Sequence, residues 1–458
     1  MTPEPAFRYQ RDFSREELQA RRRAVATAMG EGSLAVVQGA ARPGSSGLFR
    51  QTNEMYYLTG VEVPHAYLMI EGGSARSVLY LPHRNPEIER NEGIVMCADD
   101  AGSVRDVVGV EEVKPSESMA DDLAMRTYRP GRPQILVPMS PAEGPAQSRF
   151  EMTLAAASIA ADAWDGRIRR EAHLVSLLRS RLSQLTVGDL SPILDRLRLI
   201  KSPREQELLR EAGRLTAAAT TEAMRSTAPG VGEYELAALA TFKFLLGGAR
   251  SEAYRAIVAT GHNAWFGHYS QLDSVLRSGE LVLMDYAPDF RYYTSDIGRM
   301  WPVDGSYTET QRTVYGFIVE YHKTLLSLIR PGAMPEDIRR HAAETMRPIL
   351  EQTAFKDSHH MVAARTALTF PGHLSHPVGM AVHDVGDYQS AKLEPGMAFS
   401  VDPMYWIPED RLYIRCEDTV LVTADGVEVL TAAAPLELDA VEQTMREEGI
   451  LQSFRRRV

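Results

Sequence analysis

Cysteine, long apolar runs and a surplus of positive charge are all lacking in this chain. Only Cys97 and Cys416 are present, which excludes a disulfide framework and suits a reducing cytoplasm. No apolar run approaches the ~20 residues that cross a membrane, and the N-terminus has no apolar signal-peptide core. The net charge of −11 argues against nucleic acid as a partner, because nucleic-acid-binding proteins carry basic surfaces.

The length of 458 residues favours two domains, because a single core rarely serves more than about 250–300 residues. In the first part, β-prone runs at 33–37, 78–81 and 134–137 predict strands, and the Ala-, Leu- and Arg-rich stretch 150–185 predicts helix. The segment LTVGDLSP at 185–192 interrupts this pattern. We therefore expect one domain at 1–185 and a second at 190–458.

The second part combines helices with strands. Ser202 followed by Pro203 and Glu205 has the pattern of a capping box at the start of a helix. Further helices are predicted near 234–246, 308–330 and 336–352, and strands at 281–284, 398–401 and 419–422. This mixture predicts an α+β domain.

Two aspartates lie close to an apolar strand in the segment LVLMDYAPDFRYYTSDIGRMWP. Asp285 ends the run 281–284, and Asp296 follows eleven residues later, after a turn expected at 287–289. A hairpin would bring both carboxylates together at the strand ends. Like charges about 4 Å apart repel unless a proton or a cation neutralises them. Two solvent-exposed loop acids would give the same pattern, so this segment alone does not distinguish them from a metal site.

Three histidines lie together in the segment FPGHLSHPVGMAVHDVGDY. His373, His376 and His383 have small and apolar neighbours, which favours a functional site over separately packed imidazoles. The nearby pair His359 and His360 lies in a polar stretch and is expected to face solvent.

Two further acids lie in β-prone segments near the C-terminus. Asp402 follows the run 398–401, and Glu417 precedes the run 419–422. Side chains alternate along a strand, so Glu417 would face opposite to the acid that follows it. A carboxylate inside a sheet is costly without a partner, so a metal ion or Arg415 is expected beside Glu417.

Together these segments supply an oxygen-rich ligand set: Asp285, Asp296, His376, Asp402 and Glu417. Such hard ligands suit divalent cations, and Asp296 and Glu417 could each bridge two ions about 3.5–4 Å apart. The set fits Mn²⁺ better than a structural zinc site, which favours Cys and His. Zn²⁺, Co²⁺ and Fe²⁺ stay open as alternatives. The sequence therefore predicts a hydrolase with two divalent metal ions.

The same segments resemble the aminopeptidase P and prolidase family of metallopeptidases, whose catalytic domain has the pita-bread fold. RLIKSPREQELLREAG resembles the family's domain-joining helix, the two-aspartate segment its hairpin, HLSHPVGMAVHDVG its histidine loop, and LEPGMAFSVDP with IRCEDTVLV its acidic strands. FRQTNEMYYLTGVEVPHAYLMI resembles the N-terminal domain of bacterial-type aminopeptidase P. The resemblance implies a non-catalytic α/β domain at 1–185 and a pita-bread catalytic domain with a dinuclear metal site at 190–458.

The resemblance also implies a role for each ligand. Asp285 would chelate one ion, Asp296 and Glu417 would bridge the pair, and His376 with Asp402 would complete the shell of the second ion.

Other residues match family positions around the reacting bond. His268 and His383 align with family histidines that hydrogen-bond the substrate carbonyl or the tetrahedral intermediate. Arg415 matches an arginine near the bridging glutamate, where it would orient Glu417 or close the substrate pocket.

The chain departs from the family pattern at several positions. Asp402 stands where the family usually has glutamate, one methylene longer, in a residue expected to shuttle protons as well as to bind metal. Met404 replaces a usual glycine, and His373 lies three rather than four residues before His376. Tyr405 is similarly offset from a family tyrosine. His373 and Tyr405 are nevertheless the candidates for binding substrate, together with Arg415.

The implied activity is metal-dependent removal of an N-terminal residue from peptides with proline in second place, through a metal-bridging hydroxide and with Asp402 as proton donor. Three alternatives stay open: an Xaa-Pro dipeptidase (prolidase), a creatinase-like amidino hydrolase, which the five retained ligands argue against, and a pita-bread binding protein with weakened catalysis. The resemblance further implies a homodimer or a homotetramer.

Overall fold

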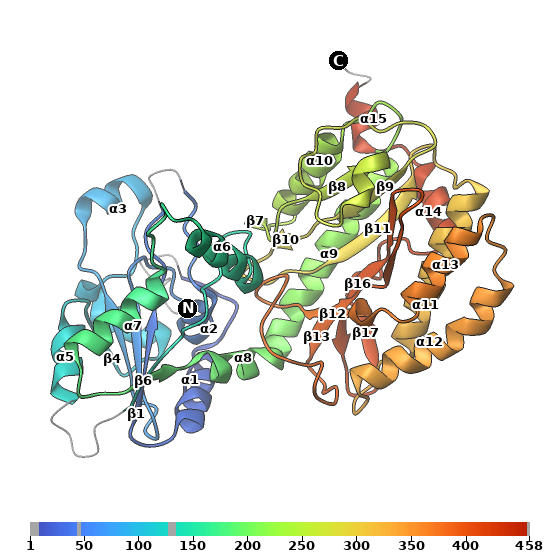
Figure 1. The fold of residues 1–458 in the computed structure, drawn as a ribbon. Coiled ribbons are helices and arrows are strands. Elements are labelled where there is room, and N and C mark those ends of the chain that lie inside the picture. The colour runs from blue at the N-terminus through green and yellow to red at the C-terminus, as the bar shows by residue number, and fades with distance from the viewer. Residues whose placement is uncertain (1–8, 44–46, 127–133, 456–458) are drawn as a thin grey trace. The chain divides into compact units, whose positions relative to one another are not determined.

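The computed structural model describes residues 9–43, 47–126 and 134–455. The chain forms two units, Met1–Arg198 and Leu199–Val458 (Figure 1). Among the described residues, no helix combines the length and the apolar character that crossing a membrane requires.

The first unit is built on one mixed six-stranded sheet. Its strands are β1 (Ser33–Gln38), β2 (Tyr67–Glu71), β3 (Ser77–Leu81), β4 (Glu112–Pro115), β5 (Gln134–Val137) and β6 (Val187–Asp189), in the order β4-β3-β2-β1-β5-β6. β1 pairs antiparallel with β2 and parallel with β5. All three strands predicted in this part are confirmed. They form because their apolar residues make up the buried core of the sheet.

Eight helices with described bounds accompany this sheet: α1 (Arg15–Met29), α2 (Asn53–Thr59), α3 (Pro86–Glu92), α4 (Ala101–Val108), α5 (Ser118–Arg126), α6 (Arg149–Ala161), α7 (Arg170–Arg181) and α8 (Ser191–Leu199). The stretch predicted as one helix contains two. It breaks because the side chain of Asp162 accepts the backbone N–H of Trp164 (2.9 Å), which favours a turn. The first unit also includes β6, so it extends beyond residue 185, where the sequence suggested its end.

The second unit is built on a sheet whose neighbouring strands all pair antiparallel. Its strands are β8 (Ile257–Thr260), β9 (Leu281–Asp285), β11 (Ile297–Pro302), β12 (Leu374–Pro377), β13 (Ala398–Val401), β16 (Glu417–Val422) and β17 (Val427–Val429). The order is β12-β13-β16-β11-β9-β8, and β17 pairs with β16. Two short ladders lie beside it: β7 (Ser251–Glu252) with β10 (Pro288–Asp289), and β14 (Met404–Ile407) with β15 (Leu412–Arg415).

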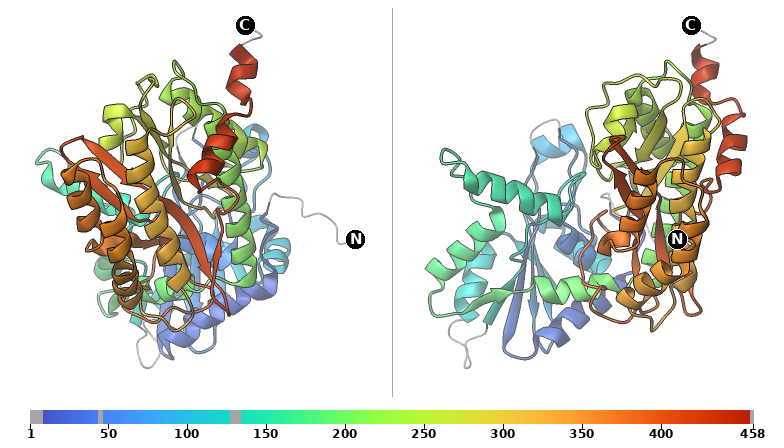
Figure 2. Two further views of the ribbon diagram at one scale, coloured as in Figure 1. Left: turned by 90° about the vertical axis from the view of Figure 1, so that its right-hand side faces the viewer. Right: turned by 45° about the vertical axis from the view of Figure 1, so that its right-hand side comes forward.

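The helices of this unit include two long pairs. α9 (Pro203–Arg225) packs beside α10 (Glu233–Leu246), and α11 (Glu309–Leu328) packs beside α12 (Pro335–Gln352) (Figures 1 and 2). The remaining helical segments are η2 (Gly261–Trp265), α13 (Ser358–Ala367), η3 (Pro371–His373), α14 (Leu438–Met445) and α15 (Ile450–Arg455). The α+β character expected for this part is confirmed.

The start of α9 shows why the sequence located these helices well. The Ser202 hydroxyl accepts the Glu205 backbone N–H at 3.3 Å, and the Glu205 carboxylate accepts the Ser202 N–H at 2.9 Å. This capping box satisfies backbone groups that the first turn leaves free. The helix then buries one apolar face, which includes Leu208, Leu209, Ala212, Leu215 and Ala219.

Candidate metal centre

The central strand β11 brings two of the predicted ligands together. Gly298 lies opposite Asp285 on one neighbouring strand and opposite Glu417 on the other. A Cβ atom at position 298 would lie 3.0 Å from the Glu417 Cβ and 3.2 Å from the Arg415 Cδ. Only glycine leaves this space, so β11 allows its neighbours' side chains to approach over it. Asp296 lies two residues before Gly298.

The other two ligands come from the adjoining strands. Asp402 follows β13, and its backbone N–H donates to the His373 carbonyl at 2.8 Å. His376 lies in β12, which pairs antiparallel with β13. His376 Nε2 is 3.3 Å from an oxygen of Asp296. Ligand atoms of Asp296, His376 and Glu417 all lie within 4.8 Å of one another.

A single guanidinium lies among the acids. Arg415 is buried and pairs with Asp402 through Nε (2.8 Å), with Glu417 through Nη2 (2.5 Å) and with Asp285 through Nη1. The sequence left open a metal ion or Arg415 as the partner of Glu417, and the structure shows that Arg415 contacts it. The planar fork of arginine suits such a multiple contact, because its donors diverge in fixed directions.

Burial and crowding change the acidity of these groups. Burial, reinforced by Glu417 and Asp285, raises the pKa of Asp296 well above its usual range. The pKa of Asp402 is also raised, by burial and by Glu417, although Arg415 opposes the shift. Burial lowers the pKa of His376. A neutral imidazole has a lone pair for a metal ion, and buried acids at this spacing are costly when all are charged.

The donor set therefore fits divalent cations. Three of the four buried carboxylates pair with one guanidinium, so negative charge is in excess when the acids are ionised. Carboxylate oxygens with one imidazole are ligands that Mn²⁺ and Zn²⁺ both accept.

Sequence reasoning missed three residues that support the acids. The Tyr254 hydroxyl lies 2.7 Å from an oxygen of Asp285 and 2.8 Å from one of Asp296. The Ser400 hydroxyl donates to Glu417, and the Thr419 hydroxyl accepts the Asp296 backbone N–H at 2.7 Å.

A signal existed for two of the three. Ser400 lies two residues before Asp402, and Thr419 lies two residues after Glu417. Side chains two residues apart on a strand share a face, so both hydroxyls could have been placed with the acids. Tyr254 lies between β7 and β8, in the segment SEAYRAIV. This segment has no such pattern.

The two histidines expected near the reacting bond lie in different settings. The ring of His383 packs against that of His376, with ring centroids 4.2 Å apart. His268 is exposed on the loop after η2, and η2 contacts β9 and β15, the strands that end in Asp285 and Arg415.

Two residues predicted to bind substrate, His373 and Tyr405, have backbone partners inside the unit. His373 is fully buried, and its ring nitrogens lie 2.5 Å from the Ala367 carbonyl and 3.4 Å from the Met404 N–H. Burial lowers the pKa of His373 to about 4. The Tyr405 hydroxyl donates to the Val314 carbonyl in α11 at 2.6 Å. Both side chains therefore bind backbone groups inside the unit, a position that supports packing rather than substrate contact.

The expectation that His359 and His360 face solvent is wrong. His360 is buried, His359 is partly buried, and both rings contact Asp410 in the turn between β14 and β15. The polarity of the surrounding sequence misled the prediction because the partner lies 50 residues further along the chain.

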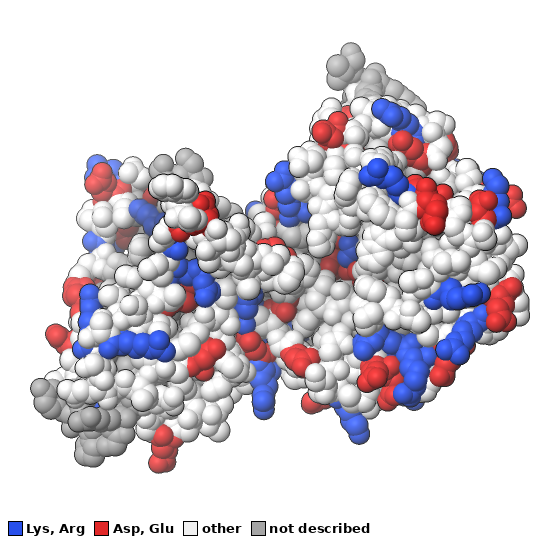
Figure 3. Space-filling model, in the orientation of Figure 1, with Lys and Arg blue, Asp and Glu red and all other residues white. Residues whose placement is uncertain are grey.

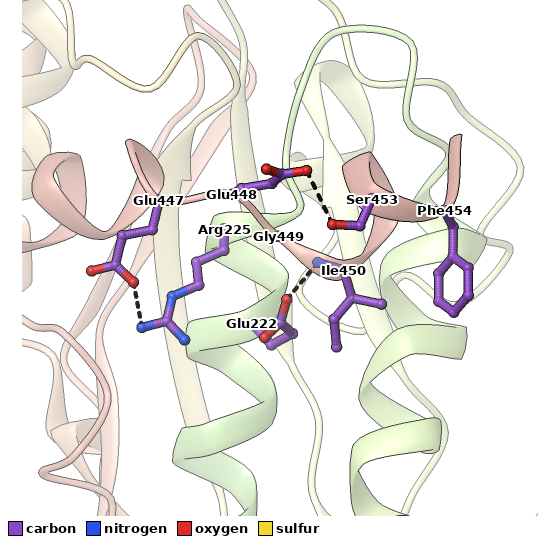
Figure 4. A pocket seen from close by; sticks show the side chains of 8 residues that line it. All are labelled: Glu222, Arg225, Glu447, Glu448, Gly449, Ile450, Ser453 and Phe454. Atoms are coloured by element: carbon purple, nitrogen blue, oxygen red, sulfur yellow. Dashed lines mark hydrogen bonds and ion pairs between the residues drawn. The ribbon is translucent and has the colours of Figure 1, made fainter. Parts of the chain in front are cut away.

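A separate cavity of about 380 Å³ lies where α9 ends near α15 (Figure 4). Its charged groups have partners within the unit: Arg225 pairs with Glu447 at 2.7 Å, and Glu222 accepts the backbone N–H of Ile450 at 2.8 Å. None of the predicted metal ligands lines it, so this cavity is not part of the candidate metal centre.

Comparison with known proteins covers both units. The family described as metallopeptidase family M24 matches residues 207–424, and the aminopeptidase P N-terminal domain matches residues 18–132. The Xaa-Pro aminopeptidase of Escherichia coli (strain K12) is 30% identical over 455 residues, covering 95% of this chain and 98% of that protein.

Solved structures give the same result. E. coli aminopeptidase P with the inhibitor Pro-Leu has a TM-score of 0.76 at 28% identity, over 95% of this chain and 98% of that one. Zinc-substituted E. coli aminopeptidase P in complex with product has a TM-score of 0.75 at 28% identity, with the same coverage. The expected pita-bread domain preceded by a smaller α/β domain is confirmed. The chain thus belongs to the aminopeptidase P family of M24 metallopeptidases.

Proposed function

We propose that this protein is a metal-dependent Xaa-Pro aminopeptidase, which removes the N-terminal residue from peptides with proline in second place. The observation that carries this proposal is the buried convergence of Asp285, Asp296, His376, Asp402 and Glu417 around Arg415. The E. coli relative carries the activity in its name, and its structure was solved with Pro-Leu. In this proposal, the unit Leu199–Val458 is the catalytic domain and the unit Met1–Arg198 is non-catalytic.

These five residues would hold two divalent ions, with Asp296 and Glu417 as the bridging ligands. Mn²⁺ is the first ion to test, and Zn²⁺, Co²⁺ and Fe²⁺ are the alternatives; the relative described above was studied with zinc in place. When bound, such a pair supplies an activated water and stabilises negative charge on the carbonyl oxygen.

The chain's own residues would position and protonate the substrate. Arg415 pairs with three of the acids, which would hold their carboxylates in place for the ions. The Xaa-Pro bond is a tertiary amide, so its nitrogen needs a proton to leave. Asp402, with its raised pKa, is the candidate donor. His268 and His383 are the candidates for hydrogen bonds to the carbonyl oxygen.

The test is a panel of Xaa-Pro peptides of two to five residues, incubated with each metal ion. We expect cleavage of tripeptides and longer peptides at the first bond, and loss of cleavage with a chelator. Asp296→Asn should lower kcat/KM by at least about 10³-fold, since oxyanion stabilisation alone is worth about 10²–10³ in rate. Asp425→Asn replaces an exposed acid and is the matched control.

The outcomes separate the alternatives. Cleavage of the dipeptide alone would indicate a prolidase, and amidino hydrolysis that survives the chelator would indicate a creatinase-like enzyme. Metal-dependent peptide binding without turnover would indicate a binding protein. Full activity of Asp296→Asn would contradict the bridging assignment.

A cytoplasmic location and a homodimer or homotetramer stay predictions. Cys97 and Cys416 are both buried free thiols, which suits a reducing compartment. Acidic and basic side chains are interspersed on the described part of the face in Figure 3, and the absence of a nucleic-acid partner likewise stays a prediction.

A further inference from the structure

A second group of histidines and acids lies at the start of α13. His359 Nε2 is 3.0 Å from one oxygen of Asp410, and His360 Nε2 is 2.5 Å from the other. Asp357 precedes the helix, and ligand atoms of Asp357, His359 and His360 all lie within 4.8 Å of one another. Asp410 therefore contacts both imidazoles of this group of three through their Nε2 atoms.

The spacing suits a tetrahedral metal ion. Zinc binds imidazole nitrogen and carboxylate oxygen at about 2.0–2.2 Å, so two ligand atoms around it lie about 3.3–3.6 Å apart. The ligand atoms of Asp357, His359 and His360, which all lie within 4.8 Å of one another, can reach this spacing through small side-chain rotations.

His360 offers an independent observation. Its side chain is only 3% exposed, and its Nδ1 atom has no hydrogen-bond partner within 9–43, 47–126 and 134–455. When Nε2–H donates to Asp410, Nδ1 keeps a buried lone pair. A buried polar atom without a partner is costly, and a lone pair on imidazole is a metal ligand.

We propose that Asp357, His359 and His360 form a binding site for a zinc-type divalent ion, distinct from the candidate metal centre, and that Asp410 orients the two imidazoles. Two imidazoles with one carboxylate differ from the oxygen-dominated set of that centre. The new site therefore favours Zn²⁺ more strongly over Mn²⁺.

The position of the site gives the ion a structural role. Asp410 lies in the turn of the β14–β15 hairpin. One strand of that hairpin starts two residues after Asp402, and the other ends at Arg415. A bound ion would tie α13 to the outer end of this hairpin and limit movement of the two residues at its inner end.

The experiment counts Zn²⁺ bound per full-length chain, after chelator treatment and dialysis, by mass spectrometry of the metal. His359→Gln should bind one equivalent less than the unaltered protein, or bind it at least about tenfold more weakly. His341→Gln replaces an exposed histidine of α12 and should bind the full number. Asp410→Asn is the second variant and should bind the same equivalent about 10–100-fold more weakly.

The same difference should persist in an Asp296→Asn background, where the candidate metal centre is impaired. The proposal thus stands or fails independently of the peptidase activity. Cobalt substitution gives a second readout: the visible absorption of tetrahedral Co²⁺ should weaken in His359→Gln and not in His341→Gln. Equal zinc content and equal spectra in all variants would overturn the proposal and leave a hydrogen-bonded His–Asp cluster.

Discussion

At the scale of single residues, Tyr254 links the two acids of the β9–β11 hairpin. Its hydroxyl is the shared partner of Asp285 and Asp296, at 2.7 and 2.8 Å. Groups of this kind orient metal ligands, and their loss usually costs about 10–100-fold in metal affinity or activity.

We therefore expect Tyr254→Phe to lower kcat/KM and the affinity for activating metal by about 10–100-fold, with the fold retained. Tyr234→Phe removes the hydroxyl of an exposed tyrosine on α10 and is the control. Metal titrations of activity measure both effects. Unchanged metal affinity in Tyr254→Phe would show that the hydroxyl does not orient these acids.

The close packing at Gly298 can also be tested with a single substitution. A methyl group there would lie 3.0 Å from the Glu417 Cβ, and overpacking typically costs about 1–3 kcal/mol. Gly298→Ala should therefore lose that much stability in urea and most of its activity, because Glu417 and Arg415 must shift. Gly426→Ala, where nothing lies within 4 Å, should change neither. Normal activity of Gly298→Ala would mean that the acids tolerate displacement.

At the scale of secondary-structure elements, Asp418 joins two strands and a helix. It accepts from Arg299 of β11 at 2.7 Å and lies 2.8 Å from His322 of α11. Burial opposes its ionisation, but Arg299 and the hydrogen bond with His322 hold the pKa of Asp418 far below its usual range. Asp418 faces opposite to Glu417 along β16, as the sequence predicted, and so serves packing rather than the candidate metal centre.

The lowered pKa of Asp418 makes the stability of the folded protein depend on pH. The unfolded chain binds the proton more readily, so the contribution of Asp418 is complete above its unfolded pKa of about 4 and is lost as pH falls below it. Asp418→Asn leaves Arg299 and His322 buried without an acid. We expect a loss of about 3–5 kcal/mol at pH 7, measured by urea unfolding.

The difference between Asp418→Asn and the unaltered protein should shrink below about pH 4, where the unfolded chain binds a proton at Asp418 that the folded protein does not. Asp425→Asn is again the control. A difference that stays constant with pH would show that lost packing, rather than lost charge, causes the destabilisation.

At the scale of the whole molecule, bound metal should stabilise the unit Leu199–Val458. An ion that binds only the folded state adds about 2.7 kcal/mol at a hundredfold excess over its Kd. For a unit of this size, that is a rise in Tm of about 5–10 °C. Mn²⁺ added after chelation should produce this rise in calorimetry, and Asp296→Asn should show little of it. An equal rise in both proteins would place the stabilising ion elsewhere.

Local patterns were enough for the long helices of the second unit, for several of its strands and for the order of the predicted ligands. The capping box at Ser202 and the apolar run before Asp285 are contained in a few consecutive residues, and their structural effect is equally local. The five predicted ligands could be read from such segments because each acid lies beside a strand.

Only the tertiary structure decided which groups meet. Arg415 contacts Asp285, 130 residues away, and His360 contacts Asp410 across 50 residues. The burial of His373 and the turn of Tyr405 toward α11 depend likewise on packing between elements. Periodicity specifies the face on which a side chain lies, but its partner across the fold depends on how strands and helices pack. That information lies in no single segment.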